Sequence, residues 1–247
     1  MLQTIDLLGV NVSRVDLGAA KDQICQWVRE KVRVYVCVAP ASTLVDARQH
    51  SDYCDVINHA AMVTPDGMPV VWLAKVKGCK DIARTYGPDL MRLLCGQAGL
   101  RHYFFGSTTD VIHALTEKLK VQYPDIAIIG KYSPLYRAQA VMEDEATIQS
   151  INDAKPDILW VGLGSPKQDH WMFLHRSRLN VPVIIGVGAA FDFLAGTKPQ
   201  APRWMQGCGL EWLFRLCCEP GRLWKRYLIG NSLFIYFALE DLWFKRS

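Results

Sequence analysis

The stretch DILWVGLGSPKQDHWM (residues 157–172), followed by VPVIIGVGAAFDF (residues 181–193), decides the fold of this chain. In each segment a short apolar run, residues 158–161 and then 183–185, ends in a Gly-x-Gly turn that leads into an expected helix. Apolar runs of this length between glycines are typical of strands buried on both faces of a parallel sheet. We therefore expect the turns at the carboxyl ends of neighbouring strands, where open α/β sheets bind ligands.

The two glycine turns also favour a phosphate ligand. A helix N-terminus presents free backbone N–H groups and a partial positive charge, both of which suit an anion. The expected binding glycines are Gly162 and Gly164 in the first turn and Gly188 in the second. Side chains able to take part in chemistry follow directly after them: Lys167, Gln168 and Asp169 in the first segment, and Asp192 in the second.

The remainder of the chain alternates short strands with helices, which predicts an α/β, doubly wound, mostly parallel sheet. Expected strands cover residues 32–38, 60–63, 102–105 and 126–130, after two short strands around Gly9. Expected helices cover residues 17–29, 43–49, 68–77, 90–98, 111–121 and 142–154. The polar, proline-containing segment 196–202 predicts a boundary between an α/β core, residues 1–197, and a helical C-terminal appendage, residues 198–247.

Asp66 stands in the strand-to-helix segment Thr64-Pro65-Asp66-Gly67, between a proline that fixes φ and a glycine that permits close approach. Two interpretations are open: Asp66 caps the next helix, or it carries out chemistry. Arg84 is either a solvated surface charge or a phosphate ligand. Gly106 ends an expected strand, and Tyr136 belongs to a loop whose aromatics either flank a base or sugar or anchor the packing.

Composition narrows the function further. The net charge is a weak +4, of which +3 falls after residue 202 in a segment rich in Trp, Phe and Leu. That combination indicates an anionic, partly apolar partner and no nucleic acid. A helix lying in the membrane interface and a helical hairpin packed on the domain both fit this segment. The apolar run 233–239 is too short to span a bilayer, and the N-terminus does not read as a secretory signal. The eight cysteines show no C-x-x-C pair and are expected to be reduced thiols.

Several chemistries are disfavoured by missing motifs. The first turn lacks the third glycine of a dinucleotide fingerprint and the Lys-Ser/Thr of a Walker loop, and no Gly-x-Ser-x-Gly elbow occurs. His170 and His175 are five residues apart and do not share a helix face, so no metal site is expected. The remaining candidates are the isolated acids Asp66 and Asp192, the amide of Gln168, and several arginines. These groups suit transfer of a sugar from a nucleotide diphosphate sugar, in which a carboxylate deprotonates the attacking hydroxyl and cations stabilise the diphosphate.

The segments TPDGMPVVW, RTYGPDLM, WVGLGSPKQDHWM, GVGAAFDFLAG, APRWMQ, GLEWLFRL and EPGRLWKRYLIGN resemble, in this order, the WecG/TagA/CpsF glycosyltransferase family. The resemblance covers nearly the whole chain. It implies an inverting, metal-independent bacterial enzyme that needs no cofactor. Such an enzyme moves a sugar from a UDP-sugar to a polyprenyl-diphosphate-linked saccharide for exopolysaccharide, common antigen or teichoic acid. It also implies a C-terminal appendage that binds the inner face of the plasma membrane from the cytoplasm, and it is compatible with a homo-oligomer.

The resemblance also implies roles for particular residues. Asp66 matches the general base, next to Gly67, and Gln168 matches a contact to the donor sugar. Arg84 matches an arginine placed for the diphosphate, and Asp192 a residue of the nucleotide pocket. Arg215, Arg222 and Arg226 match appendage arginines that fold over the diphosphates.

One segment departs from the family pattern. Many members carry Thr-x-Asn where this chain has Val38-Ala39-Pro40, and those polar side chains contact an N-acetylmannosamine-type donor. The departure makes glucose, or another sugar without an acetamido group, a plausible donor, unless Ser42 or Thr43 takes over the contact. A Rossmann-type enzyme that modifies nucleotide sugars and a non-catalytic membrane scaffold are the alternative functions.

Overall fold

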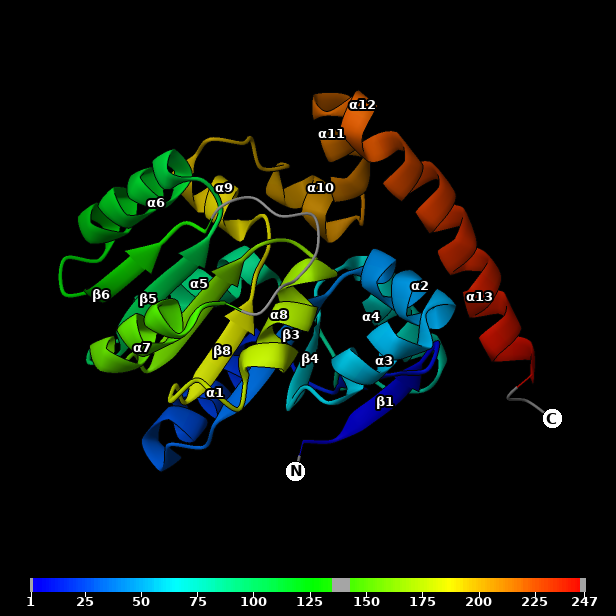
Figure 1. Cartoon of the computed structure of the whole chain (residues 1–247). Helices are drawn as coiled ribbons and strands as arrows, with labels where there is room; N and C mark the ends of the chain where they lie inside the picture. Colours follow the sequence, from blue (N-terminus) through cyan, green and yellow to red (C-terminus); the bar gives the residue numbers. More distant parts are fainter. Residues whose placement is uncertain (1, 135–142, 245–247) are drawn as a thin grey trace.

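The computed structural model describes residues 2–134 and 143–244. Its centre is a six-stranded parallel sheet of order β4-β3-β8-β7-β5-β6 (Figure 1). The strands are β3 (Val34–Ala39), β4 (Met62–Pro65), β5 (Arg101–Gly106), β6 (Ala127–Tyr132), β7 (Ile158–Gly162) and β8 (Val183–Gly186). The doubly wound α/β prediction is confirmed. The two strands that carry the glycine turns are neighbours, since Leu159 of β7 pairs with Ile184 of β8.

Alternate residues of each strand point to opposite faces of the sheet, so the core has two halves. Val36 and Trp160 face the helices α1 (Leu17–Glu30), α5 (Gly87–Cys95), α6 (Thr109–Gln122) and α9 (Ala190–Ala195). Cys37 and Leu159 face α2 (Ala41–Gln49), α3 (Ser51–Asn58), α4 (Met68–Val76), α7 (Glu145–Ala154) and α8 (Lys167–His175). The antiparallel hairpin of β1 (Thr4–Leu7) and β2 (Val10–Ser13), expected around Gly9, closes the second half.

The structure differs from the sequence prediction mainly at element ends. Helix α5 begins at Gly87, three residues before the predicted start, because Pro88 fits the first turn of a helix. Helix α7 begins at Glu145, where the Asp144 side chain accepts a hydrogen bond from the backbone N–H of Thr147. Helix α3 was not predicted. It has eight residues and buries only Tyr53, Val56 and Ile57, which leaves little periodic signal.

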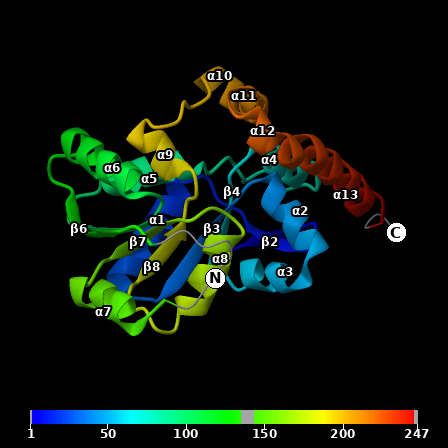
Figure 2. The same ribbon diagram turned by 45° about the horizontal axis from the view of Figure 1, so that its top comes forward.

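The C-terminal segment folds into α10 (Arg203–Gly207), α11 (Glu211–Cys218), α12 (Pro220–Trp224), the π-helical turn η1 (Lys225–Ile229) and α13 (Gly230–Phe244). Helices α10 to α12 lie over the carboxyl ends of the strands, and α13 runs alongside α2 (Figures 1 and 2). Phe234 of α13 is only 7% exposed within the core, and Lys77 pairs with Asp241 at 2.7 Å. Packing of this segment on the core is therefore confirmed, whereas the division into two units at residue 197 stays a prediction.

Within the described ranges, no helix is long and apolar enough to cross a membrane.

Candidate active site

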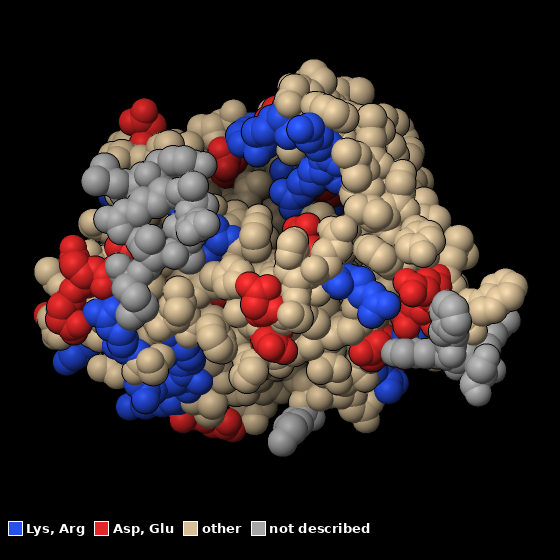
Figure 3. All heavy atoms as spheres, turned by 45° about the vertical axis from the view of Figure 1, so that its right-hand side comes forward, with Lys and Arg blue, Asp and Glu red and all other residues tan. Residues whose placement is uncertain are grey.

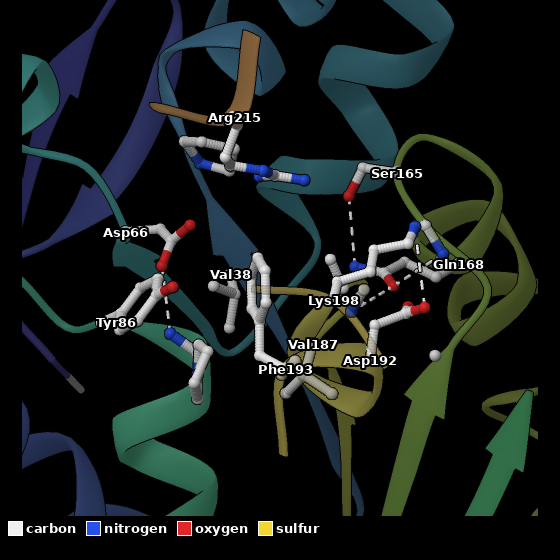
Figure 4. A pocket seen from close by; sticks show the side chains of 18 of the residues that line it. Val38, Asp66, Tyr86, Ser165, Gln168, Val187, Asp192, Phe193, Lys198 and Arg215 are labelled. Atoms are coloured by element: carbon white, nitrogen blue, oxygen red, sulfur yellow. Dashed lines mark hydrogen bonds and ion pairs between the residues drawn. The ribbon is translucent and has the colours of Figure 1, made fainter. Parts of the chain in front are cut away.

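A polar cavity of about 250 Å³ opens at the carboxyl ends of β4, β3, β8 and β7, beneath the C-terminal helices (Figure 4). It gathers residues that the sequence analysis took from four separate segments: Asp66, Gly162, Gly164, Gln168, Gly188, Asp192, Arg215, Arg222 and Arg226. Asp66 lies on one side of the cavity, and Gln168 and Asp192 lie on the other. The topology places them together because the carboxyl ends of parallel strands share one edge of the sheet.

Asp66 follows β4 directly, and its carboxylate is held from another helix. Oδ1 accepts a hydrogen bond from the backbone N–H of Gly87, at 3.0 Å, at the start of α5. The residue that caps α4 is Gly67, without a side-chain hydrogen bond, so the interpretation of Asp66 as a cap of its own helix is wrong. Burial raises the pKa of Asp66 to about 6, opposed by the charge of Arg84 and assisted by that of Glu211. A carboxylate with this pKa is mostly ionised at neutral pH and is basic enough to take a proton.

Gln168 ties the two glycine turns to each other. Its side chain is buried, with the residue 2% exposed, and Oε1 accepts from the backbone N–H groups of Gly164 (3.2 Å) and Gly188 (2.9 Å). Nε2 donates to Ser165 Oγ at 3.2 Å. Both glycine N–H groups therefore have an acceptor within the protein, and the expectation that the glycine turns hold a phosphate stays a prediction.

The C-terminal segment contributes positively charged side chains to the cavity lining. Arg215 of α11, Arg222 of α12 and Arg226 of η1 line it, and Figure 3 shows Lys and Arg side chains gathered around a hollow beneath these helices. The Arg215 guanidinium lies 5.3 Å from the centre of the Phe193 ring, and Arg226 donates to Ser42 Oγ at 2.9 Å. Residues from the far end of the chain thus supply the cations that a diphosphate needs.

Lys198 is a further cation of this wall, which the sequence analysis missed. Its Nζ lies 3.6 Å from Asp192 and 3.5 Å from Glu219, so it links the second glycine segment to the C-terminal helices. Tyr86, Phe193 and Glu211 also line the cavity and were not anticipated as site residues. The sequence offered one signal for Lys198, which is its position directly before Pro199 in the boundary segment 196–202.

Arg84 is next to Asp66, yet protein acceptors occupy its guanidinium. Nε donates to the backbone oxygen of Asp66 at 2.7 Å, Nη1 donates to Gln206 at 3.2 Å, and Nη2 pairs with Glu211. The group also stacks on Tyr86, whose hydroxyl donates to Glu211 at 2.9 Å. These contacts position the Asp66 loop and dock the C-terminal segment on it, and the contact of Arg84 with a diphosphate stays a prediction.

The other predicted residues lie away from this cavity. Gly67 lines a smaller adjoining cavity beside Asp66. Gly106 has a φ of +121°, and a Cβ there would lie 2.7 Å from Gly162, so a close approach of two strands requires this glycine. Lys167 begins α8 and is not among the lining residues, and Tyr136 lies outside the described residues.

The arrangement can support transfer of a group from a diphosphate. It holds a carboxylate poised to accept a proton, opposite a polar wall. The arginines of the lining, of which Arg222 also pairs with Glu219, can stabilise a leaving diphosphate. In the part of the chain that the structure describes, no group of three or more His, Cys, Asp or Glu side chains could hold a metal ion.

Comparisons with known proteins agree with this chemistry. The sequence model of the glycosyl transferase WecG/TagA/CpsF family matches residues 5–247. A Bacillus subtilis protein named N-acetylglucosaminyldiphosphoundecaprenol N-acetyl-beta-D-mannosaminyltransferase is 31% identical over 82% of this chain and 78% of its own. A Staphylococcus aureus protein of the same name is 26% identical over 94% of this chain and 91% of its own. The chain therefore belongs to the WecG/TagA/CpsF family of glycosyltransferases.

Proposed function

We propose that this glycosyltransferase moves a sugar from a UDP-sugar to a polyprenyl-diphosphate-linked saccharide, with inversion at the anomeric carbon. The observation that carries the proposal is a single cavity in which Asp66 faces the arginines of the C-terminal helices. The names of the relatives, which specify an N-acetylglucosaminyl-diphosphoundecaprenol acceptor, support the lipid-linked substrate.

The proposed step begins at the Asp66 carboxylate. This carboxylate takes the proton of an acceptor hydroxyl while the hydroxyl oxygen attacks the anomeric carbon of the donor. The new glycosidic bond forms as the bond between that carbon and the diphosphate oxygen breaks, and UDP leaves with the electron pair. Arg215, Arg222 and Arg226 stabilise the negative charge that develops on the diphosphate.

The donor in this proposal is a sugar without an acetamido group, of which UDP-glucose is the first candidate. Val38 and Pro40 line the cavity, and neither side chain can bond an amide. Ser42 and Thr43 are not among the residues that line this cavity, and Thr43 is buried, so in this proposal neither takes over that contact. An acetamide buried without partners would lose binding energy, so the departure from Thr-x-Asn favours the smaller donor and an exopolysaccharide product.

The proposed acceptor is anchored in a bilayer, and α13 offers an apolar outer face for the inner surface of the plasma membrane. Exposed large apolar side chains follow one another from α12 to the end of α13: Trp224, Leu228, Ile229, Ile235, Tyr236, Leu239 and Trp243. Trp243 is 80% exposed, and Figure 3 shows a broad uncharged surface over these helices. Large apolar patches of this kind on a helix are typical of interfacial binding.

A UDP-release assay tests the proposal. A panel of UDP-sugars is offered with N-acetylglucosaminyl diphosphate linked to a short prenyl chain, and release is expected only when donor and acceptor are both present. Asp66→Asn is expected to bind UDP normally and to lose about 10² to 10⁴ in rate, which is the usual contribution of a general base. Absence of UDP release from every donor, or near-normal turnover by Asp66→Asn, contradicts the proposal.

A further inference from the structure

A second cavity meets the first one at Asp66. The two share Pro40, Asp66, Glu211 and Arg215 and otherwise have different walls. The first is lined by both glycine turns, whereas the second lies between the starts of α2 and α4 and the C-terminal helices. Its further lining residues include Ser42, Gly67, Trp212, Tyr227 and Asn231.

The chemistry of transfer assigns different ligands to these two spaces. Asp66 must reach the acceptor hydroxyl, so the acceptor occupies a space that Asp66 faces and that the nucleotide sugar leaves open. The first cavity has the polar, cation-rich wall that a nucleotide diphosphate needs. The second cavity is the remaining space beside the carboxylate.

The wall of the second cavity suits a sugar ring. Trp212 and Tyr227 present aromatic rings whose centres are 6.3 Å apart and whose planes are inclined at 51°. An aromatic face packs against the apolar C–H face of a pyranose, while a few polar groups bond its hydroxyls. Ser42 and Asn231 are polar groups of this kind in the lining.

The surfaces next to the second cavity match the parts of a lipid-linked sugar in their order. Beyond Ser42 a groove beside α2 and η1 is lined by Lys225, by Asp46 and by Arg226, which also lines the first cavity. Its apolar walls include Ile229 and Leu233. Exposed Leu228 and Ile229 then lead onto the outer face of α13. A sugar, a diphosphate and a prenyl chain, in that sequence, would meet an aromatic cavity, cations and an apolar surface.

We propose that the cavity formed by Trp212, Tyr227 and Asn231 beside Asp66 is the acceptor subsite and holds the terminal sugar of the lipid-linked acceptor. This inference rests on the proposed function and adds to it the residues that bind the acceptor sugar. The C-terminal segment therefore builds one wall of each half of the site.

Two-substrate kinetics test the subsite. UDP release is measured with the active UDP-sugar and the short-chain acceptor for wild type, Trp212→Leu and Trp212→Phe. Trp212→Leu is expected to raise the acceptor KM at least about tenfold while the donor KM changes less than about twofold. Trp212→Phe keeps a ring and is expected to recover most of the loss.

Matched variants keep the outcome interpretable. Trp204→Leu removes a tryptophan that is 65% exposed on α10 and lines neither cavity, so both KM values are expected to stay at wild-type level. Asn231→Ala removes a polar group from the cavity lining and supplies an independent acceptor readout should Trp212→Leu fail to fold, as judged by circular dichroism. An unchanged acceptor KM in the folded variants, or an equal rise in both KM values, overturns the subsite. An inactive wild type instead overturns the proposed function itself.

Discussion

The acid limb of the pH–rate profile is the sharpest prediction from this structure, because one carboxylate controls it. The pKa of Asp66 is raised from 3.8 to about 6, chiefly by burial. The ionised form is the active base, so kcat/KM falls as pH drops through this pKa. With a pKa of about 6, roughly a tenth of the enzyme is active at pH 5. An unperturbed carboxyl group would leave about nine-tenths active at that pH.

A substitution at Glu211 tests whether Asp66 is the titrating group, because it changes the pKa of Asp66. Its negative charge raises the pKa of Asp66, and it also holds the Arg84 guanidinium. Glu211→Gln removes that charge and weakens the hold on Arg84, and both changes favour the ionised carboxylate. The acid limb of the variant is therefore expected at lower pH than that of wild type. Glu240→Gln on α13, which removes a carboxylate paired with Arg48 at 3.7 Å, is the charge-matched control.

The assay is initial-rate UDP release between pH 4.5 and 8.5, at constant ionic strength and with subsaturating substrates, so that kcat/KM reports the free enzyme. Wild type and Glu240→Gln are expected to share an acid limb near pH 6. An acid limb near pH 4 in wild type, or the same limb in wild type and Glu211→Gln, would refute the assignment of Asp66 as the base in this environment.

Three further outcomes follow from the same contacts. Asp66→Asn is expected to raise the free energy of unfolding at pH 7–8 by about 1–3 kcal/mol. The reason is that the raised pKa of Asp66 makes ionisation of this carboxyl group above pH 6 unfavourable in the folded state. Thermal unfolding at pH 5 and pH 8 should show a smaller increase in stability at the lower pH. Gln168→Leu leaves the N–H groups of Gly164 and Gly188 without their acceptor and is expected to cost about 1–3 kcal/mol; urea unfolding that matches wild type would contradict the role of Gln168 as a tie. Replacing Ile235, Leu239 and Trp243 by serine is expected to weaken sedimentation with anionic vesicles at least about tenfold, since each buried apolar side chain contributes about 1.5–3 kcal/mol; turnover of a water-soluble short-chain acceptor should persist, and unchanged vesicle binding would rule out this face.

The sequence alone was sufficient for the features that depend on local pattern. Two glycine-bounded apolar runs predicted neighbouring parallel strands, because a strand buried on both faces has to be apolar throughout. The proline–glycine frame singled out Asp66, and the shift in composition after residue 197 marked the segment that supplies the cavity arginines. Each of these signals lies in the same segment of the chain as the feature that it predicts.

Only the tertiary structure decided which groups the site residues contact. Arg84 and Glu211 are 127 residues apart, so no spacing in the sequence could show that Glu211 pairs with the arginine predicted to contact the diphosphate. Gln168 Oε1 accepts a hydrogen bond from the backbone N–H of Gly188, 20 residues away, so the glycine pattern alone did not show that this N–H group has an acceptor within the protein. Periodicity records which side of an element is buried, whereas hydrogen-bond partners depend on how elements distant in the chain are brought together.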